Sequence, residues 1–188
     1  MIADYPDVPP RLAPFLAQWD HVQTQVLGRL EGLSDAELRW EPAPSVLTVR
    51  TGPDGVARPD AYGLPPTPDA FLPRTLAWSI GHLGSGTLVR ADWLVGDHRL
   101  ADEEVPWPTE AEAAVSLLRR GLDAWRQGIG SMTDADLDTV GRSAYPHGLD
   151  PQLPLLDIVW WVNKELIEHA SDMWMVRDLY AASVAESR

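Results

Sequence analysis

Residues 155–179 constrain the fold more than any other part of the chain, because they repeat at the period of one helix face. The positions on that face alternate between spacings of three and four, which is typical of a buried helical seam. They are Leu155, Ile158, Val162, Glu165, His169, Asp172, Val176 and Leu179. A buried carboxylate or imidazole is costly unless it is paired, neutralised or bound to a metal ion. The run therefore predicts a long helix that carries either a polar network or a functional site.

Three other segments have helical periodicity, at about 11–30, at 73–96 and from 109 onward, and the last helix is expected at about 154–182. Short capped turns are expected at 34–40 and 131–140, where a Ser or Thr is followed three positions later by an acidic residue. No convincing strand pattern accompanies them. An all-α fold is therefore expected, in the form of one antiparallel four-helix bundle that makes a single domain of residues 1–188.

The segment 41–69 is rich in proline and glycine and predicts a long loop between the first two helices. A small hairpin is expected inside it, at 47–58. Long loops in compact domains often act as lids or binding segments, and surface excursions are at least as common. Both alternatives stay open for this loop.

The composition excludes several classes of function. A formal net charge of −13 repels nucleic-acid backbones and anionic membranes. The chain has no cysteine, so it forms no disulfide or thiolate metal site, and any thiol chemistry needs a thiol from a substrate or cofactor. The N-terminus lacks a basic stretch followed by an apolar one, and no apolar run approaches the roughly 20 residues of a membrane span. A cytoplasmic protein without nucleic-acid or membrane partners is expected.

The strongest indication of chemistry is a set of three candidate metal ligands on two of the predicted helices. Glu165 and His169 are four residues apart, the spacing at which one helix gives two ligands to one metal ion. His82 falls on the inward side of the 73–96 helix and completes a set of two histidines and one carboxylate. Three glycines near this histidine suggest either a close backbone approach or open space beside it. They are Gly81, Gly84 and Gly86.

The spacing alone supports a second interpretation equally well, in which Glu165 hydrogen-bonds His169 in a polar core and no metal binds. Asp172 lies one turn further along, either as a fourth ligand or as a carboxylate that orients an imidazole from outside the ligand set. The other histidines, in a polar helix face or in loops, are expected to be exposed: His21, His98 and His147. Adjacent Trp160 and Trp161 cannot both face inward, so one is expected to line a pocket or a dimer contact.

Three motifs, LEGLSDAELRWEP, LAWSIGHL and VNKELIEHASDMWMVRDLY, resemble in their order and separation the DinB-like superfamily of metalloenzymes. This superfamily includes mycothiol-dependent maleylpyruvate isomerases and related thiol transferases. The resemblance covers residues 11–180, and 41–69 is the part that matches least. It implies a four-helix bundle in which three histidines hold a divalent metal, one in the second helix and two spaced by four in the last.

The helix-two histidine of the family matches His82, and the second histidine of its last-helix pair matches His169. The first histidine of that pair matches Glu165, a departure that keeps a ligating atom and adds negative charge. Zn, Ni, Fe and Mn all stay open as the metal. The resemblance implies an enzyme, a transferase, isomerase or hydrolase, that acts on a small molecule with a low-molecular-weight thiol as co-substrate, and it also implies a homodimer. The alternative is a non-catalytic bundle that serves as a ligand-binding or oligomerisation module.

Overall fold

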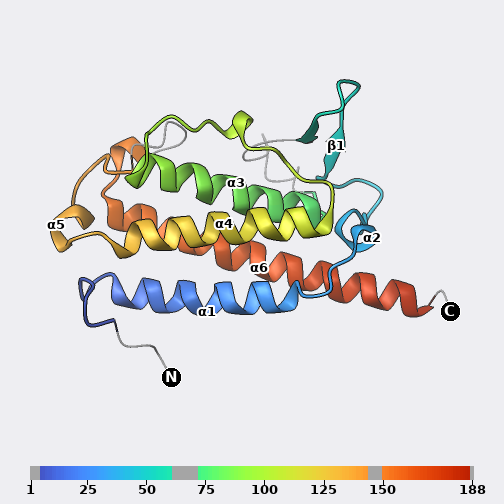
Figure 1. Cartoon of the computed structure of the whole chain (residues 1–188). Coiled ribbons are helices and arrows are strands. Elements are labelled where there is room, and N and C mark those ends of the chain that lie inside the picture. Colours follow the sequence, from blue (N-terminus) through green and yellow to red (C-terminus); the bar gives the residue numbers. More distant parts are fainter. Residues whose placement is uncertain (1–4, 61–71, 144–149, 187–188) are drawn as a thin grey trace.

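The computed structural model describes residues 5–60, 72–143 and 150–186, and most of them are helical. Four long helices lie side by side (Figure 1): α1 (Ala13–Arg29), α3 (Leu76–Val95), α4 (Ala111–Gly130) and α6 (Leu155–Glu186). The short helices are α2 (Asp35–Leu38), α5 (Asp134–Leu137), η2 (Asp102–Glu104) and η3 (Asp150–Gln152). Strands β1 (Val49–Thr51) and β2 (Ala57–Pro59) form an antiparallel hairpin. The expected helical class is confirmed.

Two pairs of long helices run parallel. Gly84 of α3 lies against Leu117 of α4, and further along both helices Leu94 lies against Gly128. The connection from Gly96 to Ala111 crosses the length of α3 before α4 begins, so the chain returns to the same end (Figure 1). Its residues can reach because extended chain advances about 3.3 Å per residue and helix only about 1.5 Å. Helices α1 and α6 are also parallel in Figure 1.

The other two pairs are antiparallel. Asp20 of α1 binds Arg126 of α4, and Gln23 binds Asp123, so positions rise along one helix as they fall along the other. The same holds for α3 and α6, where contacts join position 74, just before α3, to position 172, and position 82 to position 165. The expected antiparallel arrangement therefore holds for α1 with α4 and for α3 with α6, but not for the two parallel pairs.

The core lies between the inner faces of the four long helices. Its fully buried side chains include Leu16, Trp19, Ile80, Leu118, Leu122, Trp125 and Ile129. Helices α3 and α4 approach closely at Gly121, which has no side chain. A methyl group at this position would overlap the carbonyl of Gly84 and the hydroxyl of Thr87. A methyl group at Gly81 would likewise overlap Trp107. The close backbone approach expected around His82 is thus confirmed at Gly81 and Gly84.

The apolar seam of α6 only partly matches the expected one. Its first part is buried as expected, but the Asp172 side chain is 43% exposed and Leu179 is 48% exposed. Spacings of three and four average 3.5 residues per turn, whereas a straight helix has 3.6, so such a seam rotates away from the core along the helix. Met173 and Ala170 are buried in its later turns. In addition, α6 extends beyond its neighbours at the C-terminal end (Figure 1).

The two short capped turns differ in detail. At Thr133 both capping-box hydrogen bonds form with Asp136. At Ser34 the hydroxyl accepts the N–H of Glu37, but the Glu37 carboxylate pairs with Arg177 of α6 at 2.6 Å. The second bond of the expected box is absent here because the glutamate joins α2 to α6 instead.

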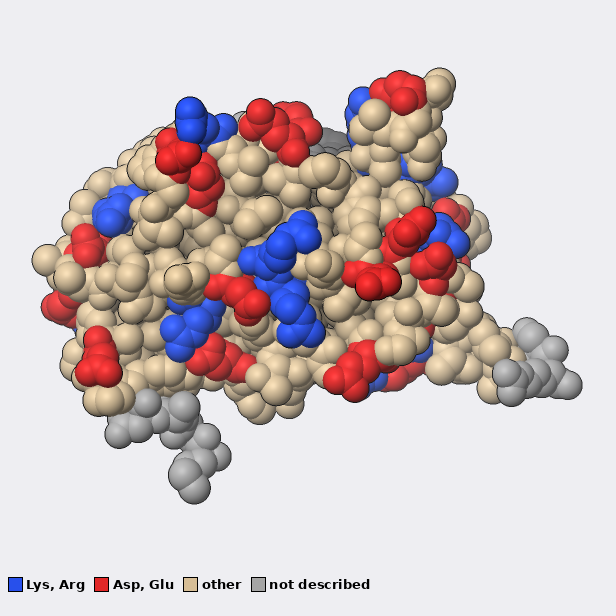
Figure 2. All heavy atoms as spheres, viewed as in Figure 1, with Lys and Arg blue, Asp and Glu red and all other residues tan. Residues whose placement is uncertain are grey.

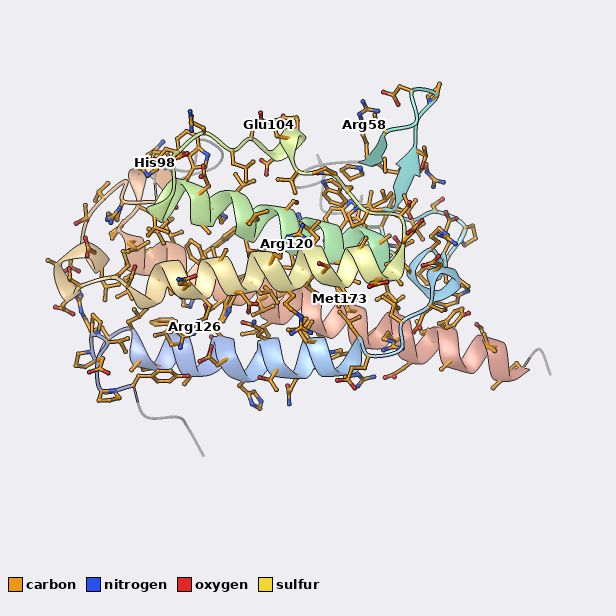
Figure 3. All side chains as sticks on the ribbon, in the orientation of Figure 1. Arg58, His98, Glu104, Arg120, Arg126 and Met173 are labelled. Atoms are coloured by element: carbon orange, nitrogen blue, oxygen red, sulfur yellow. The ribbon has the colours of Figure 1, made fainter. Side chains whose placement is uncertain are left out.

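The expected hairpin at 47–58 is confirmed and projects from the helices, with Arg58 on its second strand (Figure 3). Residues 61–69 of the expected loop lie outside the described residues. On the face shown in Figure 2, acidic and basic side chains are interspersed over the helices. None of the helices in the described ranges is both long and apolar enough to cross a membrane.

Candidate metal centre

The antiparallel contact between α3 and α6 brings His82, Glu165 and His169 together. Each of them can offer one ligand atom, and these atoms all lie within 4.8 Å of one another. Oε2 of Glu165 is 3.7 Å from Nε2 of His82 and 3.5 Å from Nε2 of His169. The two imidazole rings are 4.8 Å apart between centroids. The set is partly enclosed: the side chain of His82 is 24% exposed, that of Glu165 is 19% exposed and that of His169 is 7% exposed.

The distances at Glu165 can be compared with those of two kinds of polar cluster. Hydrogen bonds from N–H to oxygen have donor–acceptor distances of about 2.7–3.2 Å, and the two contacts to Glu165, at 3.7 and 3.5 Å, are somewhat longer. Two ligand atoms about 2.1 Å from a tetrahedral ion are about 3.4 Å apart. These two contacts are therefore close to the spacing of ligands that share one ion.

The surroundings favour a neutral imidazole at His82 and an ionised carboxylate at Glu165. Burial lowers the pKa of His82, and the charges of His169 and Arg74 act in the same direction against the influence of Glu165. Burial raises the pKa of Glu165, but its interactions with His169 and His82 outweigh burial and hold that pKa well below the usual value. A neutral imidazole and an ionised carboxylate are the forms that bind a metal ion.

Asp172 lies beside the cluster but outside it. Its Oδ2 is 4.0 Å from Nδ1 of His169 and 2.9 Å from Nη1 of Arg74. Nδ1 of His169 is buried and has no hydrogen-bond partner among the described residues. Asp172 therefore lies on the side of His169 that faces away from Glu165, where a carboxylate can orient the ring once it moves slightly closer.

Two residues near the site were not among the predicted site residues. Trp78 stacks on His82, with ring centroids 4.8 Å apart and an interplanar angle of 15°. The guanidinium of Arg74 lies 5.2 Å from the Trp78 ring centroid. The sequence did contain a signal for Trp78, because Trp78 and His82 are spaced by four and so share one face of α3. Arg74 lies just before α3 begins at Leu76, so helical spacing does not place it.

The remaining histidines lie elsewhere. His21 is exposed on α1, and His98 is exposed in the loop after α3, with a φ of 57° (Figure 3). These two expectations are confirmed. His147 lies outside the described residues.

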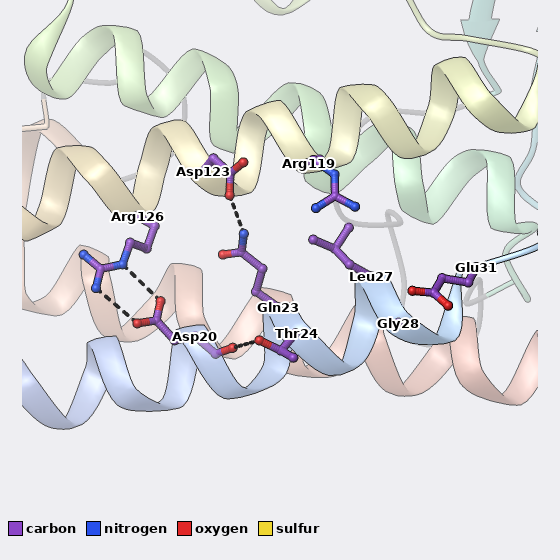
Figure 4. A pocket seen from close by; sticks show the side chains of 9 residues that line it. All are labelled: Asp20, Gln23, Thr24, Leu27, Gly28, Glu31, Arg119, Asp123 and Arg126. Carbon is purple, nitrogen blue, oxygen red and sulfur yellow. Dashed lines mark hydrogen bonds and ion pairs between the residues drawn. The ribbon is translucent and has the colours of Figure 1, made fainter. Parts of the chain in front are cut away.

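Two concave regions differ in their relation to the centre. One adjoins His82 and Glu165 and extends towards Arg90 and Trp161. The other is an open, polar groove between α1 and α4 (Figure 4), where Asp20 pairs with Arg126 and Gln23 donates to Asp123. No member of the His82 cluster lines the groove of Figure 4.

A comparison with protein-family models matches residues 18–173 to the DinB superfamily. The match includes His82, Glu165 and His169. Comparisons with curated proteins and with solved structures gave no match.

Proposed function

The chain belongs to the DinB superfamily, and on that premise we propose that it is a divalent-metal-dependent enzyme that acts on a small molecule. His82, Glu165 and His169 are the proposed ligands, in a four-helix bundle of the family type. The observation that carries the proposal is the convergence of three ligand atoms within 4.8 Å from two helices. Two histidines and one carboxylate leave coordination positions for a substrate.

The chemistry follows from this donor set. A divalent ion, when bound, supplies Lewis acidity that stabilises negative charge on a substrate oxygen or sulfur. The chain's own residues arrange the site around it. Glu165 contributes a negative charge, the stacked Trp78 restrains the ring of His82, and Asp172 lies 4.0 Å from Nδ1 of His169, where a small shift would let it orient that ring. Two imidazoles and a carboxylate suit Zn, Ni, Fe or Mn.

The proposed reaction is a transfer or isomerisation that uses a low-molecular-weight thiol. The chain has no cysteine, so the nucleophilic sulfur has to come from a co-substrate. Sulfur is a favourable ligand for several of these metals. A thiol therefore suits both the open coordination positions and the composition of the chain.

A second candidate function is a non-catalytic module for ligand binding or oligomerisation. This candidate is favoured by exposed apolar side chains on α6, among them Trp160, Ile167, Met175 and Leu179. Through these side chains two copies of the chain would form a homodimer. If the cluster were only a polar core, His169→Leu would be nearly neutral or stabilising.

The proposed function is tested by measuring metal content in protein purified without a histidine tag. We expect about one divalent ion per chain in the wild type and a strong loss in His82→Ala and His169→Ala. His21→Ala is the matched control, because His21 is exposed on α1. No metal in any sample, together with stabilisation by His169→Leu, would support the second candidate instead.

A further inference from the structure

A pocket beside the proposed metal centre continues along α3 to a buried arginine. It has room of about 70 Å³, enough for a small functional group. Its lining comes from α3 and α6 and includes His82, Gly86, Arg90, Trp161 and Glu165. Arg90 is two helical turns from His82, which separates their Cα atoms by about 12 Å along the axis. The pocket thus joins the proposed ligands to a cationic group.

Gly86 leaves this passage open. It lies one turn from His82 and one turn from Arg90 on the same face of α3. A methyl group at Gly86 would meet no described atom within 4 Å, whereas methyl groups at Gly81 and Gly84 would overlap neighbours. Glycine weakens a helix relative to alanine, and close packing among the described residues does not explain why a glycine is present at position 86. What the missing side chain does here is leave space in the pocket between His82 and Arg90.

Arg90 has the burial and geometry of a recognition residue. It is only 9% exposed, and its guanidinium lies 5.1 Å from the ring centroid of Trp161. Stacking on an indole stabilises a buried cation and restrains its plane. A guanidinium has five N–H donors, so it can donate hydrogen bonds to a carboxylate in addition to the contacts it already makes. Trp161 also meets the expectation that one of the two adjacent tryptophans lines a pocket.

The charge of the chain makes this arginine selective. With a formal net charge of −13, the protein as a whole repels anions. A cation inside the pocket offsets that repulsion at one place, about two helical turns from the proposed ligands. A ligand that bridges the two therefore has a metal-binding group at one end and an anionic group at the other.

We propose that this pocket receives the carboxylate of a small acidic substrate or thiol co-substrate, with Arg90 binding the carboxylate and Gly86 keeping the passage open. The inference rests on the proposed metal-dependent function. It assigns Arg90 as a specificity-determining residue, because the planar fork of a guanidinium matches a carboxylate with two parallel hydrogen bonds.

The test compares two thiols on Co²⁺-loaded protein. The acidic probe is 3-mercaptopropionate and the neutral probe is 2-mercaptoethanol, and binding is followed by the absorption band of a cobalt-bound thiolate. We expect the wild type to prefer the acid by about tenfold or more, the size of a charge-assisted hydrogen bond. Arg90→Gln should remove that preference by weakening the acid alone, and Arg90→Lys should retain part of it. Arg120→Gln, at an exposed arginine of α4, is the matched control.

A second variant tests the passage while leaving the buried Arg90 unchanged. Gly86→Leu places a side chain in the passage, and its Cβ meets no described atom within 4 Å, so we expect it to fold and to weaken the binding of the acid by about tenfold. Thermal unfolding of each variant checks that the fold is kept. Equal binding of the two thiols by Co²⁺-loaded wild type would overturn the inference and leave the metal centre intact. Absence of Co²⁺ binding, seen before any thiol is added, would overturn the proposed function and this inference with it.

Discussion

Oε2 of Glu165 lies 3.5 Å from Nε2 of His169, one turn further along α6, and 3.7 Å from Nε2 of His82 on α3. One carboxylate oxygen is therefore the common neighbour of both histidines. The family resemblance implies a histidine at this position, and the glutamate keeps a ligating atom there while adding negative charge. Glu165 is thus the residue that links the two histidines of the proposed site.

Asp172→Asn should weaken metal binding by about tenfold, the lower end of the range for residues that orient a ligand. The reason is that its carboxylate lies 4.0 Å from Nδ1 of His169 and is held by Arg74. Isothermal titration with Zn²⁺ measures the effect. Asp178→Asn is the control, because Asp178 is exposed on the same helix and pairs with Arg29. Equal affinity in Asp172→Asn and wild type would exclude this role.

Gly121→Ala and Gly86→Ala should change stability in opposite directions. A methyl group at Gly121 would overlap the Gly84 carbonyl, so we expect the free energy of unfolding to fall by about 1–3 kcal/mol. Gly86 has open space, so alanine there should raise that free energy by up to about 1 kcal/mol through helix propensity. Urea unfolding monitored by circular dichroism tests both. A stabilising Gly121→Ala would contradict the close approach of α3 and α4.

Asp92→Asn should destabilise the end of α3. The carboxylate accepts the backbone N–H groups of Asp97, Arg99 and Leu100 at 3.1, 2.8 and 2.9 Å. Burial alone would raise the pKa of Asp92, but these hydrogen bonds outweigh it and lower that pKa. At pH 7 we expect a loss of about 1–2 kcal/mol in the free energy of unfolding.

The pH dependence of this loss has a definite sign. Because folding lowers the pKa of Asp92, its stabilisation is complete above the ordinary aspartate pKa of about 3.9 and disappears as the pH falls through the lowered value. The difference between Asp92→Asn and wild type should therefore shrink in acid. Asp97→Asn, at an exposed position in the same loop, should show a small effect at every pH. A difference that grows in acid would refute this explanation.

The sequence predicted the helices and the proximity of the three candidate ligands, because both depend on local spacing. Periodicity located α1, α3, α4 and α6, and the spacing of Glu165 and His169 placed both on one face. It did not predict that α3 and α4 are parallel, since that depends on the path of the connection between them. It also missed the departure of Leu179 from the core, because a seam of period 3.5 rotates on a helix of period 3.6.

The pocket could be predicted only in part. The glycines around His82 suggested either close contact or open space, and only the packing of α4 distinguishes Gly84, which is in contact, from Gly86, which is not. Arg90 and Trp161 come from different helices, so no spacing within one segment pairs them. Their contact depends on the antiparallel alignment of α3 with α6.

The central claim is that Glu165 is a metal ligand, and comparing Glu165→Gln with Glu168→Gln tests it most directly. Both changes remove one negative charge from neighbouring turns of α6, but Glu168 is 56% exposed and pairs with Lys164. In Co²⁺ titrations followed by visible absorption, we expect near wild-type affinity for Glu168→Gln. For Glu165→Gln we expect the affinity to fall by more than about 100-fold, beyond the range typical of residues outside the ligand set. Equal affinities in the two variants, or no Co²⁺ binding by the wild type, would contradict the central claim.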